Sequence, residues 1–137
     1  AEYFNNDPNN LGYYTDSQDS TLATTSTCEY WMLDRTAGNT AVRVSLSYEN
    51  ERSCGINDPS FLQVTHWNGS KWENKGMQSY DGDTISGTIT SVEFIDNFSP
   101  FTLGSISGIN PLPIQLSAFT VEKLGNEARL ALSLIHY

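Results

Sequence analysis

The stretch Ala41–Tyr48, AVRVSLSY, decides the fold class of this chain. Apolar side chains fill positions 42, 44, 46 and 48, and polar side chains fill the positions between them. Successive side chains of a β-strand point to opposite faces. The strict alternation therefore predicts a strand with one face in a core and the other in water.

Shorter runs of the same kind flank this stretch at a spacing of about ten residues, which is typical of a β-sandwich. We predict strands over 29–35, 61–67, 84–92 and 98–103, and an extended, loop-rich start over 1–27. No stretch has a convincing helical period. The sequence therefore predicts an all-β fold, an antiparallel β-sandwich of the Ig-like or jelly-roll-like kind.

The segment Trp67–Trp72, WNGSKW, predicts a β-hairpin. Asn68-Gly69 readily adopts the positive φ angles of tight hairpin turns. The two tryptophans could then face each other across the hairpin. They could also stack on sugar rings, or pack in the core.

The last third of the chain predicts an appendage to the sandwich. We expect a sandwich over 1–108, a stiff Pro-rich linker over 109–113, and two strands over 114–137 joined by a turn at Gly125-Asn126. A lone hairpin is marginal in water, so these strands need partners. They could add to the open sheet edge of a neighbouring copy, begin a further domain, or fold back on their own sandwich. The apolar candidates for assembly are Ile114, Leu116, Phe119, Leu130, Leu132 and Leu134.

The net charge of the chain disfavours two classes of binding partner. Seven basic and 16 acidic residues give a net charge of −9 among 137 residues. Nucleic acids and anionic membrane surfaces are bound through Lys and Arg, so both are disfavoured as partners. No apolar run is long enough to span a membrane, and the sequence contains no basic segment followed by an apolar stretch of the kind found in signal peptides. A start at Ala1 suggests a processed secreted protein or an excised fragment.

Cys28 and Cys54 are the only cysteines, and they lack the spacing of a zinc site. In a secreted β-protein they suggest one disulfide, closing a loop of about 27 residues with a stabilisation of roughly 3.5 kcal/mol. The alternative is two separate reduced thiols in a core.

The sequence offers little for catalysis or for cofactors. His66 and His136 are the only histidines, and neither has a recognisable nucleophile partner. We therefore expect no enzyme activity and no cofactor. Calcium is the one ion that the acidic turns Asp81–Asp83 and Asp16–Asp19 could attract, although neither turn matches an EF-hand loop and turn chemistry explains both.

An ordered series of motifs runs along nearly the whole chain: AEYF at 1–4, CEYW at 28–31, SCG at 53–55, WNGSKW at 67–72, GTI at 87–89, SPFTLG at 99–104 and PLPI at 111–114. This series resembles a β-sandwich module of large secreted Bacteroidetes proteins. Those proteins carry type IX secretion C-terminal regions and are often surface adhesins or cell-wall-associated proteins. The resemblance implies a secreted or cell-surface location, and it supplies no catalytic residues that could be carried over to this chain.

Two further points follow from the resemblance. Ser20 and Thr84 each follow an aspartate, as in the O-glycan acceptor motif of Bacteroidetes, and are candidate acceptors. After Pro-Leu-Pro the family usually continues through a Trp-containing strand into a sorting domain, whereas this chain reads LSLIHY over 132–137.

We therefore expect an extracellular, non-enzymatic structural or adhesive module. Its C-terminal strands would pair with a second copy, as in a filament, or with a neighbouring domain. The alternative expectation is a carbohydrate-binding module of a larger secreted protein, with a polysaccharide as its partner.

Overall fold

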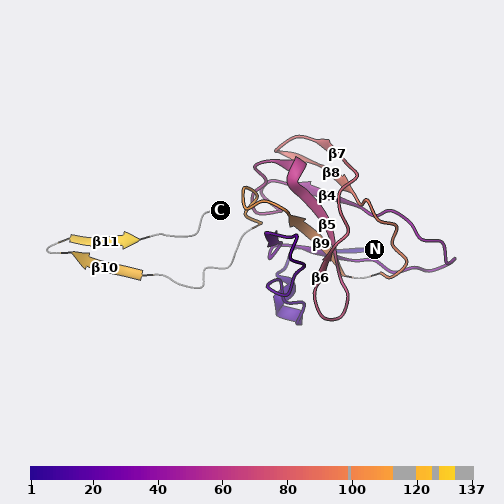
Figure 1. The fold of residues 1–137 in the computed structure, drawn as a ribbon, viewed down its shortest axis with the longest axis horizontal. Helices are drawn as coiled ribbons and strands as arrows, with labels where there is room; N and C mark the ends of the chain where they lie inside the picture. The colour runs from indigo at the N-terminus through magenta and orange to yellow at the C-terminus, as the bar shows by residue number, and fades with distance from the viewer. Residues whose placement is uncertain (99, 113–119, 125–126, 132–137) are drawn as a thin grey trace.

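The computed structural model describes residues 1–98, 100–112, 120–124 and 127–131. The elements of these residues are almost entirely strands, with two short 3₁₀ helices (Figure 1). In chain order they are β1 (Glu2–Phe4), η1 (Pro8–Leu11), β2 (Thr24–Thr25), β3 (Tyr30–Met32), β4 (Ser45–Glu49), η2 (Pro59–Phe61), β5 (Leu62–Trp67), β6 (Trp72–Asn74), β7 (Ser79–Gly82), β8 (Ser86–Thr90), β9 (Phe101–Ser105), β10 (Thr120–Leu124) and β11 (Glu127–Ala131).

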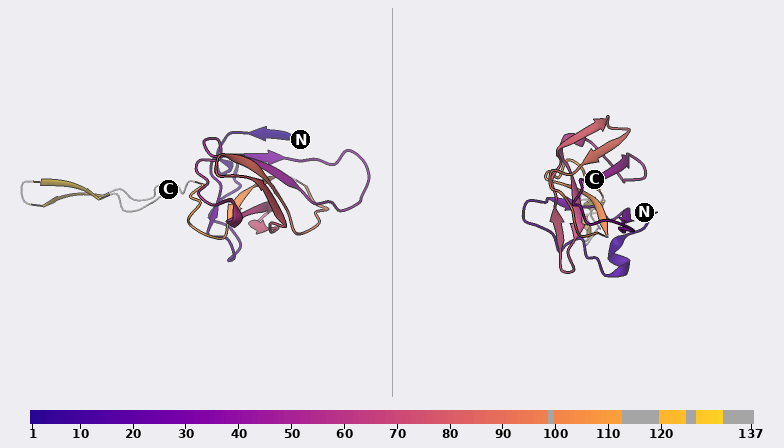
Figure 2. Two further views of the ribbon diagram at one scale, coloured as in Figure 1. Left: turned by 90° about the horizontal axis from the view of Figure 1, so that it is seen from above. Right: turned by 90° about the vertical axis from the view of Figure 1, so that its right-hand side faces the viewer.

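The strands of residues 1–112 form two antiparallel sheets (Figure 2). A six-stranded sheet has the order β1-β3-β9-β5-β6, with β2 also pairing with β9. A three-stranded sheet has the order β4-β8-β7. The predicted all-β, sandwich-like fold is confirmed.

The core lies between these two sheets and follows the alternation of the strands. Leu46 and Tyr48 of β4 are 2% and 1% exposed, while Ser45 and Ser47 between them are exposed. The apolar cluster comprises Val44, Leu46, Tyr48, Ile56, Leu62, Val64, Ile89, Ile95, Phe101, Leu103 and Leu112. The alternation fails at its start: Val42 is 41% exposed, because it precedes β4 and is held only by an isolated bridge to Ile95.

The N-terminal residues supply β1 and β2 to the six-stranded sheet and also pack against it. The ring of Phe4 stacks on Tyr30 at 4.9 Å between centroids, and the ring of Tyr13 meets Trp67 edge-on at 5.9 Å. Trp72 Nε1 donates to the backbone oxygen of Tyr13 at 3.2 Å. The polar start of the chain is therefore an ordered part of the sandwich that contains β1, η1 and β2, rather than only loops.

The predicted disulfide is confirmed. Cys28 and Cys54 are bonded, with their Cα atoms 6.3 Å apart. The bond joins the residues just before β3 to the turn that follows β4.

The segment predicted as a linker, residues 109–113, is partly built into the sandwich. Asn110 and Leu112 are fully buried, and Leu112 belongs to the apolar core cluster. The composition of 109–113 predicts a linker between domains, but the side chain of Asn110 is hydrogen-bonded inside the sandwich. The sandwich therefore extends to Leu112.

The two C-terminal strands form the predicted hairpin. β10 pairs with β11 in antiparallel register, with Leu124 opposite Glu127 and Val121 opposite Leu130. Within the described residues they pair with no other strand. The turn residues 125–126 and the candidates Ile114, Leu116, Phe119, Leu132 and Leu134 lie outside the described residues.

Candidate functional site: a pocket at one end of β5 and β9

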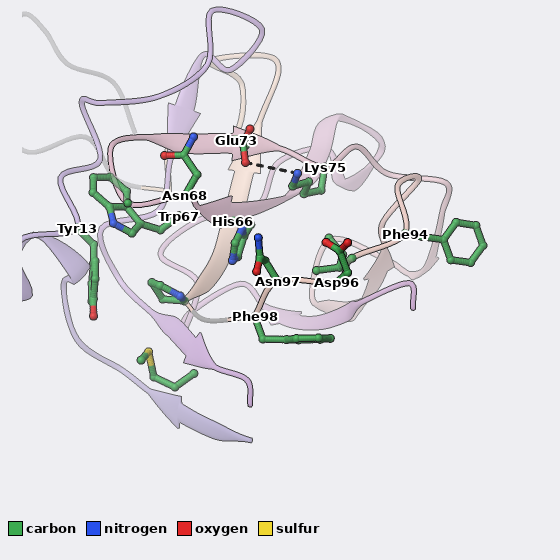
Figure 3. Close-up of a pocket in the computed structure, with 14 residues that line it drawn as sticks. Tyr13, His66, Trp67, Asn68, Glu73, Lys75, Phe94, Asp96, Asn97 and Phe98 are labelled. Carbon is green, nitrogen blue, oxygen red and sulfur yellow. Dashed lines mark ion pairs between the residues drawn. The ribbon is translucent and has the colours of Figure 1, made fainter. Parts of the chain in front are cut away.

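A pocket of about 440 Å³ opens between the β5–β6 hairpin and the loop that leads into β9 (Figure 3). This volume lies within the range of small-ligand sites. The lining combines aromatic and apolar side chains with amides and charged groups. The lining residues are Tyr13, Met32, His66, Trp67, Asn68, Gly69, Glu73, Lys75, Phe94, Ile95, Asp96, Asn97, Phe98 and Pro100.

The hairpin that forms one wall is built as the sequence predicts. Trp67 lies opposite Trp72 in the register, with their ring centroids 5.6 Å apart. Asn68 closes the turn, because its Oδ1 accepts from the backbone N–H groups of Ser70 at 2.8 Å and Lys71 at 2.9 Å. Gly69 supplies the positive φ of 103°. The turn is therefore held by hydrogen bonds within the hairpin itself.

The two tryptophans of this hairpin have different environments. Trp67 is half-buried and lines the pocket. Trp72 is fully buried, so its ring has no free face for a sugar. The prediction that Trp72 stacks on a glycan is therefore wrong, because its ring packs against Trp67 and its Nε1 is bound to the backbone oxygen of Tyr13. Trp67 remains a candidate.

The opposite wall comes from residues 94–98. Asp96 and Asn97 are exposed, and the close-up shows Phe94 turned away from the other lining side chains (Figure 3). The ring of Phe98 is fixed from outside the pocket by the Arg35 guanidinium, 4.8 Å from its centroid. Nothing in the sequence singled out Asp96 and Asn97, since a short polar segment between apolar residues reads as an ordinary loop.

Acidic side chains outnumber lysine and arginine side chains in the lining of the pocket. Lys75 Nζ lies 3.5 Å from Glu73 Oε1 and 4.0 Å from Glu93 Oε1, so two carboxylates share one ammonium group. Asp96 adds a further carboxylate to the lining. The buried His66 lies beneath, with its ring 4.6 Å from the ring of Phe101. The lining offers hydrogen-bonding groups and aromatic surface, and Lys75, its one lysine, is already engaged.

The other end of β5 and β9 holds the segment by which the chain leaves the sandwich. We call Asn110, Pro111 and Leu112 the exit clip. Asn110 Oδ1 accepts from the backbone N–H groups of Asn57 at 2.7 Å and Asp58 at 2.8 Å, and its Nδ2 donates to the Asp58 oxygen at 2.7 Å. These bonds replace backbone partners that a strand would have supplied.

The rest of the exit clip is held by the residues beside the disulfide. The backbone N–H of Thr27, next to Cys28, donates to the Leu112 oxygen at 3.2 Å. A Cβ atom added to Gly55, next to Cys54, would lie 3.0 Å from Pro111 Cγ. Leu112 has a φ of +49°, a costly conformation for a bulky residue, which its burial and these contacts impose.

The acidic turns are explained by hydrogen bonds within the protein. Asp83 Oδ1 accepts from the backbone N–H groups of Ile85 at 2.9 Å and Ser86 at 3.2 Å, which lowers its pKa. Asp19 binds Lys71 Nζ at 2.7 Å, and this contact lowers the pKa of Asp19. Within the described part of the chain no group of three or more His, Cys, Asp or Glu side chains could hold a metal ion.

The candidate glycan acceptors lie at the surface. Ser20 and Thr84 are both exposed. Their modification stays a prediction.

Comparisons with known proteins add no family to these observations, since no family model, curated protein or solved structure matches the chain. Among the described residues no helix is long and apolar enough to cross a membrane.

Proposed function

We propose that this chain is an extracellular, non-enzymatic module that binds a carbohydrate in the pocket between the β5–β6 hairpin and residues 94–98. The observation that carries the proposal is the composition of one pocket of about 440 Å³. It combines the half-buried Trp67 with the amides of Asn68 and Asn97 and the carboxylate of Asp96. Sugar rings present apolar C–H faces and rims of hydroxyl groups, which match aromatic surface and planar polar groups.

The charges favour an uncharged saccharide. The net charge of −9 repels uronic, sulfated or sialylated polymers at long range. Inside the pocket Lys75 is shared between Glu73 and Glu93, so recruiting it for an anionic ligand would break an existing ion pair. The disulfide is compatible with the extracellular location that the proposal assumes.

Retention on insoluble polysaccharides, followed by calorimetry with matching oligosaccharides, tests the proposal. Asn97→Ala removes an exposed amide that lines the pocket, and Trp67→Ala removes its indole surface. We expect each variant to lose at least about tenfold in affinity, which is about 1.4 kcal/mol. Trp67 also packs on Tyr13 and Trp72, so circular dichroism must show that the Trp67→Ala fold is intact.

Asn6→Ala is the matched control, because Asn6 is exposed and lies outside the pocket lining. This variant should bind like the parent chain. If a broad panel of neutral polysaccharides retains none of the proteins, the pocket is not a carbohydrate site.

A second function, self-assembly, is favoured by a separate observation. β10 and β11 pair only with each other within the described residues, and two strands alone are marginally stable. We propose that this hairpin pairs with a sheet edge of a neighbouring copy. Native mass spectrometry of the full chain should then show oligomers that disappear when residues 113–137 are deleted. A full chain that is monomeric at all concentrations would contradict self-assembly.

A further inference from the structure

We propose that the sandwich transmits tension between the pocket and the exit clip, and that the antiparallel pair β5–β9 is the element that bears it. The inference rests on the proposed function only in taking the pocket as the point where a ligand attaches. The mechanical behaviour belongs to the fold itself and does not depend on which ligand is bound.

One end of the β5–β9 pair carries the pocket. His66 lies opposite Phe101 in the register, and His66 and Trp67 at the end of β5 line the pocket. Phe98 and Pro100, just before β9, line it from the other strand. A ligand held there pulls on the C-terminal end of β5.

The other end of the pair carries the exit clip. Leu62, the first residue of β5, lies opposite Ser105, the last residue of β9. Asn110 Nδ2 donates to Ser105 Oγ at 3.3 Å, and the Asn110 backbone oxygen accepts from Thr24 Oγ1 at 3.2 Å. Tension applied through the following chain therefore enters at the C-terminal end of β9.

The two points of attachment lie at opposite ends of one antiparallel ladder. Five residue pairs, from Leu62↔Ser105 to His66↔Phe101, separate them, a span of roughly 14 Å. A pull on the C-terminal ends of both strands slides β5 along β9, so the hydrogen bonds of the ladder are loaded together. A pull across a ladder from one end would instead open its bonds one after another.

The exit clip shares the tension between β9 and two other parts of the sandwich, the start of β5 and the residues beside the disulfide. Asn57 and Asp58, which Asn110 binds, lead through η2 into β5. The Thr27 contact passes tension to the residues beside the disulfide. The carboxylate of Glu29, next to Cys28, is held in turn by Ser53 Oγ at 2.6 Å, next to Cys54. The exit is thus tied to both halves of the covalently closed loop.

Single-molecule force spectroscopy on the full, oxidised chain tests the inference. One handle is placed after Tyr137 and the other at Ser70, in the exposed hairpin turn at the pocket. The matched control places the second handle at Thr84, also exposed. Thr84 lies at the exit end, because Asn50 Nδ2 donates both to its oxygen at 3.0 Å and to the Ile56 oxygen at 3.1 Å.

We expect the sandwich to unfold at a force at least about twofold higher with the Ser70 handle than with the Thr84 handle, since forced unfolding reports the barrier along the loaded direction. Equal forces, or a higher force with the Thr84 handle, would overturn the inference.

A variant of the clip supplies a second reading. Asn110→Asp keeps an acceptor for Asn57 and Asp58 but loses the donated bonds to the Asp58 oxygen and to Ser105. Asn110→Asp should lower the unfolding force measured with the Ser70 handle, whereas Asn6→Ala should leave this force unchanged. An unchanged force in Asn110→Asp would show that the exit clip does not carry the tension. Loss of carbohydrate binding with the force ordering intact would count against the proposed ligand alone.

Discussion

At the scale of single residues, the buried carboxylate of Glu29 ties three segments together. Its side chain is fully buried and accepts from Ser53 Oγ at 2.6 Å and from the Tyr3 hydroxyl at 2.8 Å. Arg52 Nε lies 3.0 Å from Glu29 Oε2. Burial raises the pKa of Glu29 despite these favourable contacts, and burial together with the Glu29 carboxylate raises the pKa of Tyr3 to about 12.

This raised pKa makes stability depend on pH. Because the folded state binds the Glu29 proton more tightly than the unfolded state, the contribution is fully present below the ordinary pKa of 4.5. It is lost as pH rises through the folded pKa. Glu29→Gln should therefore remove part of the fall in the free energy of unfolding that urea denaturation measures as the pH rises above 4.5.

Glu2→Gln is the control for this measurement, since Glu2 is exposed. It should keep the pH dependence of the parent chain. Glu29→Ala, which leaves the groups around Glu29 without their acceptor, should cost about 3 kcal/mol or more at neutral pH. A Glu29→Gln variant with the parent's full pH dependence would show that Glu29 is not the titrating group.

Burial at single positions was the part that sequence reasoning predicted least. Trp67 and Trp72 are equivalent in a hairpin motif, yet one lines the pocket and the other is interior. The difference comes from Tyr13, almost sixty positions away, whose backbone oxygen binds the Trp72 indole. Asn110 was likewise predicted as a linker residue, because its partners Asn57 and Asp58 are distant in sequence. The Asn-Pro step gave no sign of burial.

At the scale of elements, the disulfide joins the two segments that hold the exit clip. Removing it with Cys28→Ser and Cys54→Ser together should cost roughly 3.5 kcal/mol from the freed unfolded chain. We expect the midpoint of urea denaturation to fall accordingly and the transition to become steeper, because the unfolded chain without the bond is less compact. The parent chain treated with reductant should match the double variant.

The alternative outcome for the disulfide is equally clear. If the double variant unfolds at the same urea concentration as the oxidised parent, the bond does not constrain the unfolded chain. In that case the hydrogen bonds around Glu29 and Asn110 are sufficient to hold these segments.

Elements with a strong local pattern were predictable, and those defined by distant partners were not. β4, β5 and the β5–β6 hairpin follow from alternation and from the Asn-Gly turn. β7 was missed, because Ser79–Gly82 is exposed on both faces and has no apolar alternation. It exists as a strand because β8 supplies its hydrogen-bond partners. β1 likewise depends on pairing with β3.

At the scale of the whole molecule, the sandwich places the pocket at one end of the β5–β9 pair and the exit clip at the other. The pocket could be predicted only in part. Trp67 was singled out from its hairpin, but the facing wall comes from residues 94–98. That wall is brought to the hairpin by the β5–β9 register, which no local pattern reveals. The exit clip was predicted as part of a linker because prolines are common between domains. Its burial depends on residues distant in sequence that pack around it.

The boundary of the folding unit gives the last prediction. Leu112 is fully buried in the core cluster, and losing such a side chain costs about 2–5 kcal/mol. Losing Asn110 strands the N–H groups of Asn57 and Asp58, at about 1–3 kcal/mol each. These costs approach the whole stability of a small domain, about 5–15 kcal/mol. A chain ending at residue 112 should therefore fold, and one ending at residue 109 should not.

Thermal melts followed by circular dichroism, with NMR spectra at 25 °C, distinguish these two chains. The chain 1–112 should melt cooperatively near the temperature of the full chain, because in the described residues β10 and β11 pair only with each other. The chain 1–109 should lack a cooperative transition. Without Leu112 the core has a cavity open to water, and the residues beside the disulfide lose their contacts with the exit clip. If both chains melt alike, the exit clip does not stabilise the sandwich. Tension from the C-terminal side would then enter the sandwich directly at Ser105 of β9.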